Sequence, residues 1–311
     1  LVCTPAAALG SCRKKLADPH GDDLSEYEKI FSFFKRYDIR YFFYIGGNDS
    51  MDTVVKLSEY SKDKNYETVF MGVPKTIDND LMGTDHTPGF GSAAKYVATV
   101  MQEIACDCSV YTTKAVTIVE VMGRDAGWLT AAAGLPRILG ENTADLIYLP
   151  EVAFDEEKFI ADLRKQLEIK PNVVVAVSEG IKTESGEYVG EKKQSGAVDI
   201  FGHRYLAGTA KYLEGLVKEK IGCKVRSVEL NLPQRCASHI LSKTDIEESF
   251  ETGKISVAFS TRSESNNGYV TVLRRRDGDG YRVDYDCVHA ENIANKTKTV
   301  PVEMITDEKN N

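Results

Sequence analysis

Several features that define particular protein classes are missing from this 311-residue sequence. No apolar run approaches the roughly 20 residues that a membrane-spanning helix needs. Lys and Arg number 39 against 47 Asp and Glu, so the net charge is −8 and no general basic surface is available for nucleic acid or an anionic membrane. Internal repeats and low-complexity segments are also absent. We therefore expect a globular protein with neither a nucleic-acid nor a membrane partner.

Cysteine is present, but its pattern favours neither disulfides nor a metal site. The seven cysteines are odd in number and irregular in spacing, and the chain is long enough to fold without disulfide bonds. Cys106 and Cys108 form a C-x-C pair with no second pair to complete a zinc site. The first five residues lack the basic and apolar regions of a signal peptide. These observations predict reduced thiols and a cytoplasmic protein.

Short apolar runs alternate with amphipathic stretches along most of the chain. Runs rich in Val, Ile and aromatic residues predict strands at 41–45, 69–73, 115–121, 146–149, 173–177 and 225–230. Helical patterns lie between them, at 26–36, 51–60, 92–105, 126–135, 157–167 and 205–220. This alternation is typical of βαβ units, so we predict an α/β fold with parallel sheets and helices on both faces.

Polar clusters follow four of the predicted strands. They are G-G-N-D-S at 46–50, P-K-T-I-D-N-D at 74–80, M-G-R-D at 122–125 and S-E-G at 178–180. Ligands of parallel sheets bind beyond the carboxyl ends of the strands, so the four clusters together predict a binding site.

Each cluster suggests a particular chemistry. The glycines at 46–50 allow close approach of an anion to a helix N-terminus with Ser50 as the N-cap, although a tight strand-to-helix turn explains them equally well. In the second cluster, Asp78 is placed to accept a hydroxyl proton and Lys75 to neutralise a phosphoryl group. The alternative for this D-N-D run is a plain turn or a Ca²⁺-binding loop, but the later residues that an EF-hand needs are absent.

The clusters at 122–125 and 178–180 indicate a sugar-phosphate pocket. Arg124 supplies a cation, and Glu179 supplies a carboxylate for hydroxyl groups. Arg226 and Arg235 follow later with guanidinium groups that suit phosphate, although a surface ion pair explains each arginine taken alone. The G-F-G at 89–91 follows no strand, so it predicts the start of a helix rather than a dinucleotide site.

Taken together, these motifs resemble the phosphofructokinase family, most of all its pyrophosphate-dependent branch. The resemblance runs from about residue 9 to 253, and its most specific part is P-K-T-I-D-N-D followed by E-V-M-G-R at 120–124. It implies two similar Rossmann-like αβα domains with the active site in the cleft between them. The phosphate-donor domain would comprise 1–88 and 235–285, with the family's first strand and Gly-rich loop upstream of Leu1. The fructose 6-phosphate domain would comprise 89–234 and 286–311.

The same resemblance implies a glycolytic reaction and its cofactor. Pyrophosphate would phosphorylate the 1-hydroxyl of fructose 6-phosphate reversibly, giving fructose 1,6-bisphosphate and phosphate, with Mg²⁺ as cofactor. The protein would be a homo-oligomer, a dimer or tetramer, because Arg226 matches an arginine that a neighbouring subunit contributes to the 6-phosphate.

Residue roles follow from the motif positions. The resemblance implies Asp78 as the proton acceptor, with Lys75 and Arg124 as the other catalytic residues. The fructose 6-phosphate site would be formed by Thr76, Asp78, Met122, Gly123, Arg124, Glu179, Arg226 and Arg235. The donor site would be formed by Arg13, Gly47, Asn48, Asp49, Ser50 and Lys75. Metal contacts would come from Asn48 and Asp80.

Two positions bear on the phosphate donor. The family's ATP-dependent enzymes have G-G-D-G-S and P-G-T-I-D-N-D, whereas this chain has Asp49 and Lys75 at the variable positions. A carboxylate at 49 repels the α-phosphate of a nucleotide, and the lysine adds positive charge at the transferred group. Two alternatives stay open, which are an ATP-dependent 6-phosphofructokinase and a non-catalytic regulatory subunit of the same fold. Asn48 replaces the metal-linked aspartate of the family, which weakens a direct contact with Mg²⁺.

Overall fold

The computed structural model describes residues 7–12, 14–193, 208–263 and 265–305. These residues form two compact units. Unit 1 is built on Ser92–Leu241, and unit 2 on Ser11–Gly91 together with Ser242–Lys298. Within the described part of the chain, no helix is both long and apolar enough to cross a membrane.

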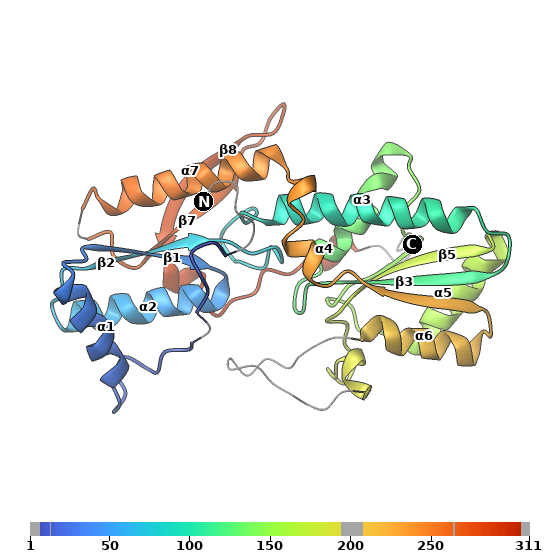
Figure 1. Cartoon of the computed structure of the whole chain (residues 1–311), viewed down its shortest axis with the longest axis horizontal. Helices are drawn as coiled ribbons and strands as arrows, with labels where there is room; N and C mark the ends of the chain where they lie inside the picture. The colour runs from blue at the N-terminus through green and yellow to red at the C-terminus, as the bar shows by residue number, and fades with distance from the viewer. Residues whose placement is uncertain (1–6, 13, 194–207, 264, 306–311) are drawn as a thin grey trace. The chain divides into compact units, whose positions relative to one another are not determined.

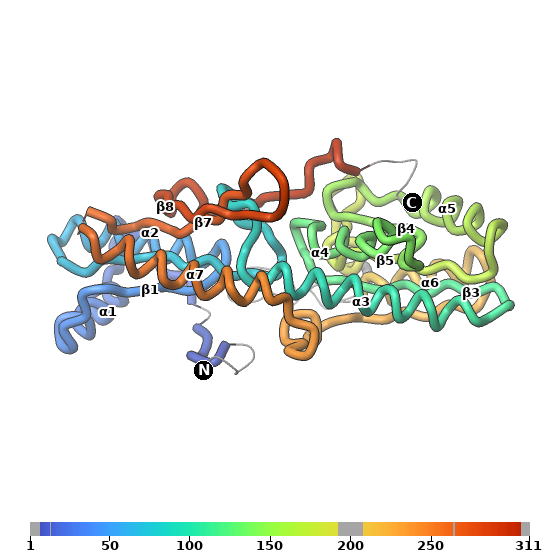
Figure 2. Tube along the Cα trace, turned by 90° about the horizontal axis from the view of Figure 1, so that it is seen from above, coloured from blue at the N-terminus to red at the C-terminus, as the bar shows by residue number. Residues whose placement is uncertain are grey.

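Unit 2 is a four-stranded sheet covered on both faces by helices (Figure 1). The strand order is β1-β2-β7-β8, in which the first three strands are parallel and β8 is antiparallel to β7. Helices α1 and α2 cover one face, and α7 covers the other, where it lies along β7 and β8 in both views (Figures 1 and 2). The elements are α1 (Ser25–Arg36), β1 (Tyr41–Gly46), α2 (Asn48–Asp63), β2 (Val69–Pro74), α7 (Lys243–Ser260), β7 (Tyr269–Arg275) and β8 (Val283–His289).

Aromatic side chains fill the core of unit 2. Tyr27 and Phe31 of α1 are fully buried, and they pack against Tyr60 of α2 with ring centroids 4.8 and 5.0 Å away. Phe70 of β2 lies 5.6 Å from Phe31. Burial of rings of this size contributes several kcal/mol and fixes the two helices against the sheet.

Unit 1 contains an all-parallel sheet with the order β4-β5-β3-β6. Its buried strands are almost continuously apolar, as expected for strands covered on both faces. Helices α5 and α6 pack on one face and α3 on the other. The elements are α3 (Phe90–Ser109), β3 (Ala115–Val121), α4 (Trp128–Ala131), β4 (Leu146–Tyr148), α5 (Glu156–Ile169), β5 (Asn172–Ser178), α6 (Thr209–Lys220) and β6 (Lys224–Glu229).

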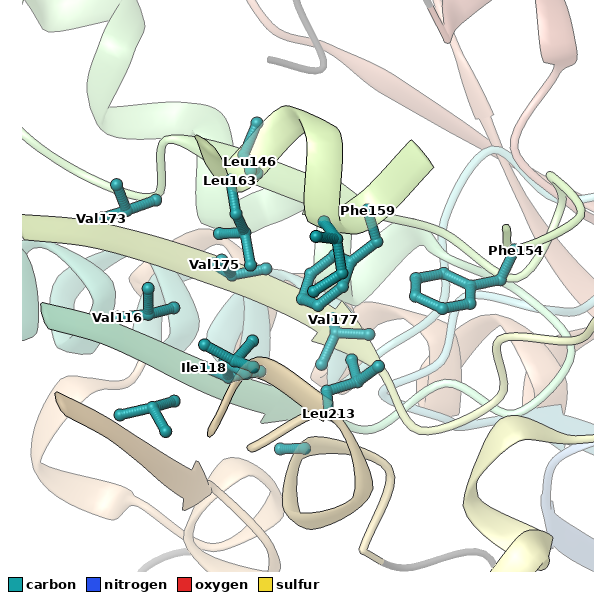
Figure 3. Close-up of a cluster of buried hydrophobic side chains, with 14 of the residues drawn as sticks. Val116, Ile118, Leu146, Phe154, Phe159, Leu163, Val173, Val175, Val177 and Leu213 are labelled. Carbon is teal, nitrogen blue, oxygen red and sulfur yellow. The ribbon is translucent and has the colours of Figure 1, made fainter. Parts of the chain in front are cut away.

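In the core of unit 1, every second side chain of strand β5 points to the same face of the sheet. Val173, Val175 and Val177 of β5 all point to the same face, where they meet Phe159 and Leu163 of α5 (Figure 3). All five side chains are at most 1% exposed. This packing holds the sheet rigid up to the ends of β3 and β5, where the predicted ligand loops begin.

The α/β prediction is confirmed, with one correction to a helix. The predicted helix 126–135 is only the single turn α4 followed by the 3-10 helix Ala132–Leu139. Pro136 lies inside this segment, and its ring and missing N–H are incompatible with a continued α-helix. The predicted helix 205–220 begins at Thr209 as far as the structure describes it, because residues 205–207 lie outside the described part.

The two units differ from the expected domain boundaries near the C-terminus. Residues 286–298 belong to unit 2, whereas the family resemblance placed 286–311 in the other domain. The reason is β8, whose full length pairs with β7, followed by a bridge between Thr297 and Leu81. Residues 7–10 and 235–241 are grouped with unit 1 rather than with the expected donor domain.

Candidate functional site

In unit 2, the two predicted donor loops lie side by side at one edge of the sheet. Strands β1 and β2 pair in parallel up to Gly46 and Pro74, so both chains leave the sheet at the same level. The Lys75 N–H then donates to the Gly46 carbonyl over 3.0 Å. The sheet register therefore brings residues 46–50 and 74–80 together, as the strand-end rule predicts.

The loop at 46–50 starts helix α2, but Ser50 is not its N-cap. The helix begins at Asn48, and Gly47 occupies the cap position, where its carbonyl accepts from the N–H groups of Ser50 and Met51. Ser50 lies in the first turn, and a Cβ on Gly46 would come within 1.9 Å of its Oγ. Asp49 is exposed in the same turn. A carboxylate thus stands at the helix end that would otherwise attract a nucleotide phosphate.

The Asn48 side chain forms hydrogen bonds within the protein, to the backbone of residues 295 and 296. Its Oδ1 accepts from the Asn295 N–H at 2.7 Å, and its Nδ2 donates to the Lys296 carbonyl at 2.9 Å. Asn295 in turn donates from Nδ2 to Asp52 in α2. Both polar atoms of Asn48 are therefore engaged by residues 295–296, which argues against its predicted contact with a metal ion.

Residues 74–80 form a loop that is tied down at several points while Lys75 stays exposed. Thr76 donates from its N–H to the Pro88 carbonyl and accepts at its own carbonyl from Thr87 Oγ1. The Asp78 N–H donates to Thr76 Oγ1 at 3.1 Å. Asp78 itself is half-buried. The loop thus presents one exposed ammonium group and two partly shielded carboxylates, those of Asp78 and Asp80, from a fixed backbone.

Lys298 lies far from this loop in the sequence but is hydrogen-bonded to it in the structure. Lys298 was not identified as part of the site from the sequence. Its Nζ donates to Asn79 Oδ1 and the Thr84 carbonyl, both at 3.0 Å, and to the Asp85 carbonyl at 2.7 Å. Burial lowers the pKa of Lys298 to about 8, although the charges of Asp85 and Asp80 act in the opposite direction. No motif in the sequence connects residue 298 to residues 79–85, which are about 215 positions earlier.

In unit 1, the clusters at 122–125 and 178–180 also meet at one sheet edge. Strands β3 and β5 pair up to Val121 and Ser178. The Gly123 N–H donates to Glu179 Oε1 at 3.3 Å, and Ser178 Oγ donates to the Gly123 carbonyl at 2.7 Å. Gly123 has a φ of 130°, a conformation that L side chains rarely adopt.

Gly180 allows the two loops of unit 1 to approach closely. A Cβ at this position would lie 1.8 Å from the Arg124 carbonyl oxygen, so no other residue fits without moving Arg124. The Arg124 Nε is buried and has no hydrogen-bond acceptor among the described residues. A buried guanidinium N–H without an acceptor is costly in a finished structure, and an anionic ligand would satisfy it.

Two of the remaining predicted arginines, Arg235 and Arg226, lie on exposed positions. Arg235 follows Gln234, whose Oε1 accepts from the Met122 N–H at 3.0 Å, so this segment contacts the loop that contains Arg124. Arg226 is exposed on β6, an edge strand of the sheet. Arg13 lies outside the described residues.

Unit 1 also contains a buried carboxylate that the sequence analysis did not single out. Glu120 is 6% exposed on β3, two residues before Met122, and burial raises its pKa. Its Oε2 accepts from the Ala210 N–H at 2.8 Å, in the first turn of α6. Glu120 is the first residue of the E-V-M-G-R motif, so the sequence pointed to its position. The motif alone does not show that the Glu120 side chain is directed at α6.

The structure thus gathers the predicted residues into two sets, each within its own unit. The set of unit 2 comprises Gly47, Asn48, Asp49, Ser50, Lys75, Thr76, Asp78 and Asp80. The set of unit 1 comprises Met122, Gly123, Arg124, Glu179, Arg226 and Arg235.

Comparisons with known proteins agree on one family. A family model described as phosphofructokinase matches residues 1–240. The pyrophosphate–fructose 6-phosphate 1-phosphotransferase of Xanthomonas campestris is 41% identical over 303 residues, which cover 97% of this chain and 71% of that protein. The protein of the same name from Halomonas elongata is 37% identical, with 98% and 72% covered. The crystal structure of pyrophosphate-dependent phosphofructokinase from Nitrosospira multiformis superposes with a TM-score of 0.84 at 34% identity, over 99% of this chain and 71% of that one.

Proposed function

Because this chain belongs to the phosphofructokinase family, we propose that it transfers a phosphoryl group reversibly between pyrophosphate and the 1-hydroxyl of fructose 6-phosphate. The observation that supports this donor most directly is the placement of Asp49 and Lys75. Hydrogen bonding between Lys75 and Gly46 keeps their two loops adjacent at the carboxyl ends of β1 and β2. A carboxylate at 49 disfavours a nucleotide, and an exposed lysine at 75 suits a small, highly charged donor.

In the proposed reaction, Asp78 accepts the proton of the sugar hydroxyl. The oxygen attacks the nearer phosphorus of pyrophosphate, a new O–P bond forms, and the bond to the second phosphate breaks. That phosphate leaves with the electron pair, and Lys75 stabilises the charge on the transferred group. The products are fructose 1,6-bisphosphate and phosphate. Because the bond broken is a phosphoanhydride of modest transfer potential, the reaction runs in both directions.

The sugar phosphate would be held by the set in unit 1. Arg124 offers a buried N–H that lacks an acceptor within the described residues, and Glu179 offers a carboxylate to hydroxyl groups while it fixes the Gly123 backbone. Arg235 follows the Gln234 segment that contacts Met122. We further propose that Arg226 serves the site of a neighbouring subunit, so that the active protein is a homo-oligomer.

Mg²⁺ fits the loop at 74–80 better than the loop at 46–50. Asp78 and Asp80 provide carboxylate oxygens, the ligands that Mg²⁺ prefers, whereas the Asn48 amide is engaged by residues 295–296. Among the described residues no group of three His, Cys, Asp or Glu forms a protein-only metal site. This agrees with an ion held by one or two carboxylates and the phosphates of its donor, where it would neutralise charge on the transferred group.

Two alternatives are distinguished by residues already described. An ATP-dependent enzyme of the same fold would have to tolerate Asp49 in the first turn of α2. A regulatory subunit would bind sugar phosphate without turnover, yet this chain has Asp78 on a well-anchored loop.

The location that we propose is the cytoplasm. The free thiols among the described cysteines agree with this reducing compartment.

The direct experiment is to incubate the purified protein with fructose 6-phosphate, Mg²⁺ and pyrophosphate, and to identify fructose 1,6-bisphosphate by mass spectrometry. The reverse reaction is followed from fructose 1,6-bisphosphate and phosphate. An Asp78→Ser variant excludes a contaminating enzyme, since loss of a general base lowers the rate by about 10²–10⁴-fold. Binding of fructose 6-phosphate without product would instead favour the regulatory subunit.

A further inference from the structure

Residues 295–298 form a short strap that fastens both donor loops of unit 2. The backbone of Asn295 and Lys296 is held by the Asn48 side chain at the start of α2. Two residues later, the Lys298 N–H donates to the Asp80 carbonyl at 2.8 Å. Thr297 forms an isolated antiparallel bridge with Leu81. The strap therefore contacts the loop at 46–50 at one end and the loop at 74–80 at the other.

Lys298 makes the most extensive contacts of the strap. Its ammonium group has three N–H donors, and the structure provides three oxygen acceptors, on Asn79, Thr84 and Asp85. The donor–acceptor distances of 2.7–3.0 Å are those of well-formed hydrogen bonds. Through one side chain and one backbone N–H, Lys298 thus fixes Asn79 and Asp80 together.

The backbone at Asn79 explains why such a clamp matters. Asn79 has a φ of 54°, in the left-handed region that only a few residue types tolerate, and it is only 3% exposed. This turn separates Asp78 from Asp80, so it sets the directions in which the two carboxylates point. A strained turn persists only when its surroundings hold it, and the Lys298 contact with Asn79 Oδ1 is part of that hold.

We propose that Lys298 is a positioning residue that keeps the Asp78–Asn79–Asp80 turn in the conformation required for phosphoryl transfer, a role that rests on the proposed function. In the proposed reaction, Lys298 touches neither the substrate nor the reacting atoms. Its effect passes through Asn79 and Asp80 to the carboxylate of Asp78. Because binding of the sugar phosphate depends mainly on unit 1, the predicted loss falls on turnover rather than on affinity for fructose 6-phosphate.

The test compares Lys298→Met, Lys298→Arg and Lys296→Met. Methionine keeps the aliphatic length of Lys298 but donates no hydrogen bond, so we expect kcat to fall about 10–10²-fold, with KM for fructose 6-phosphate changed less than about threefold. Arginine restores donors and charge and should recover most of kcat. Lys296 is exposed, and its Nζ contacts only the Asn292 carbonyl among the interactions described, so Lys296→Met is the matched control and should behave as wild type.

A second readout does not depend on activity. Native-state hydrogen exchange should show faster exchange of backbone amides at 76–82 in Lys298→Met, and no such change in Lys296→Met. If the amides at 76–82 exchange at the wild-type rate in Lys298→Met, the proposal that Lys298 holds this loop in place is wrong. Unchanged kcat in a folded Lys298→Met protein, or a fall in kcat that Lys298→Arg does not reverse, would overturn the positioning role. If wild type turns over neither pyrophosphate nor ATP, the proposed function fails, and the exchange experiment still decides whether the clamp exists.

Discussion

Glycines at the ends of β3 and β5 show how single residues shape the sugar-phosphate set. Position 180 accommodates only glycine, because the Arg124 carbonyl occupies the space that a Cβ would fill. The close approach in turn lets Glu179 reach the Gly123 N–H. Arg124 and Glu179 are thus brought together by a residue that itself has no functional group.

We predict that Gly180→Ala raises KM for fructose 6-phosphate by about tenfold or more, because the added methyl group forces the Arg124 backbone to move. Overpacking of this kind also lowers the free energy of unfolding by about 1–3 kcal/mol. Steady-state kinetics and thermal unfolding measure the two effects.

Gly253→Ala is the matched control for Gly180→Ala. Gly253 lies inside α7, and a Cβ there would have no neighbour within 4 Å from elsewhere in the described part of the chain. Alanine should leave KM unchanged and raise stability by up to about 1 kcal/mol. A folded Gly180→Ala protein with wild-type KM would show that the contact with Arg124 does not matter for sugar binding.

At the scale of elements, six strands followed from sequence, whereas β7, β8 and helix α7 lie outside the predicted ranges. The runs of Val, Ile and aromatic residues predicted β3 to the residue and five further strands, β1, β2, β4, β5 and β6, to within one or two positions. Helix α7 has the opposite pattern, since Glu248, Thr252 and Ser256 are buried while Phe250 and Val257 are exposed. A search for apolar residues at helical spacing therefore misses it.

The candidate site could be predicted only where its residues form local motifs. The loops at 74–80 and 122–125 were visible because their chemistry lies in consecutive residues at strand ends. Lys298 and Gln234 reach these loops from distant parts of the chain, so only the fold reveals them. The role of Ser50 was misjudged because Gly47, which has no side chain to form a cap, occupies the N-cap position.

Helix α6 and strand β6 are joined by one carboxylate with a lowered pKa. Glu214 is 6% exposed, and its Oε2 accepts from the Ser227 N–H at 3.2 Å. Hydrogen bonds from Lys218, Ser227 and Lys211 lower the pKa of Glu214 from its usual 4.5 to about 2. A group whose pKa is lower in the folded state stabilises the protein above its unfolded pKa. That stabilisation is lost as pH falls from about 4.5 towards 2.

We predict that Glu214→Gln lowers the free energy of unfolding at pH 7 by about 1–2 kcal/mol, because it removes the charge from these hydrogen bonds. The difference in Tm from wild type should shrink as pH falls below 4.5. Glu219→Gln, at an exposed position of the same helix, is the control and should have little effect at either pH. A Tm difference that stays constant between pH 7 and pH 3.5 would contradict this explanation.

At the scale of the whole molecule, we propose that the site takes residues from more than one copy of the chain. Arg226 is exposed on the edge strand β6, where its guanidinium group is available to another subunit. We predict that the active protein is at least a dimer in solution. Arg226→Ala should raise KM for fructose 6-phosphate by about 10–10²-fold and leave KM for pyrophosphate nearly unchanged, because a guanidinium–phosphate contact contributes about 1.5–3 kcal/mol.

Light scattering at the assay concentration and steady-state kinetics together test this prediction. Lys224→Ala is the control, because it removes an exposed cation two residues before Arg226 on the same strand. A catalytically active monomer, or equal effects of the two substitutions, would exclude a role for Arg226 in a neighbouring site.

We propose that Asp49 and Lys75 together set the phosphate donor. This role is tested most directly by initial rates with pyrophosphate and with ATP for wild type, Asp49→Gly, Lys75→Gly and the double variant. Wild type should use pyrophosphate far better than ATP, and Asp49→Gly should admit ATP because the repelling carboxylate is gone. Lys75→Gly should lower turnover with pyrophosphate by about 10²-fold or more, the scale of one lost preorganised charge contact. Better use of ATP than of pyrophosphate by wild type, or no gain in ATP use by Asp49→Gly, would show that these two residues do not set the donor.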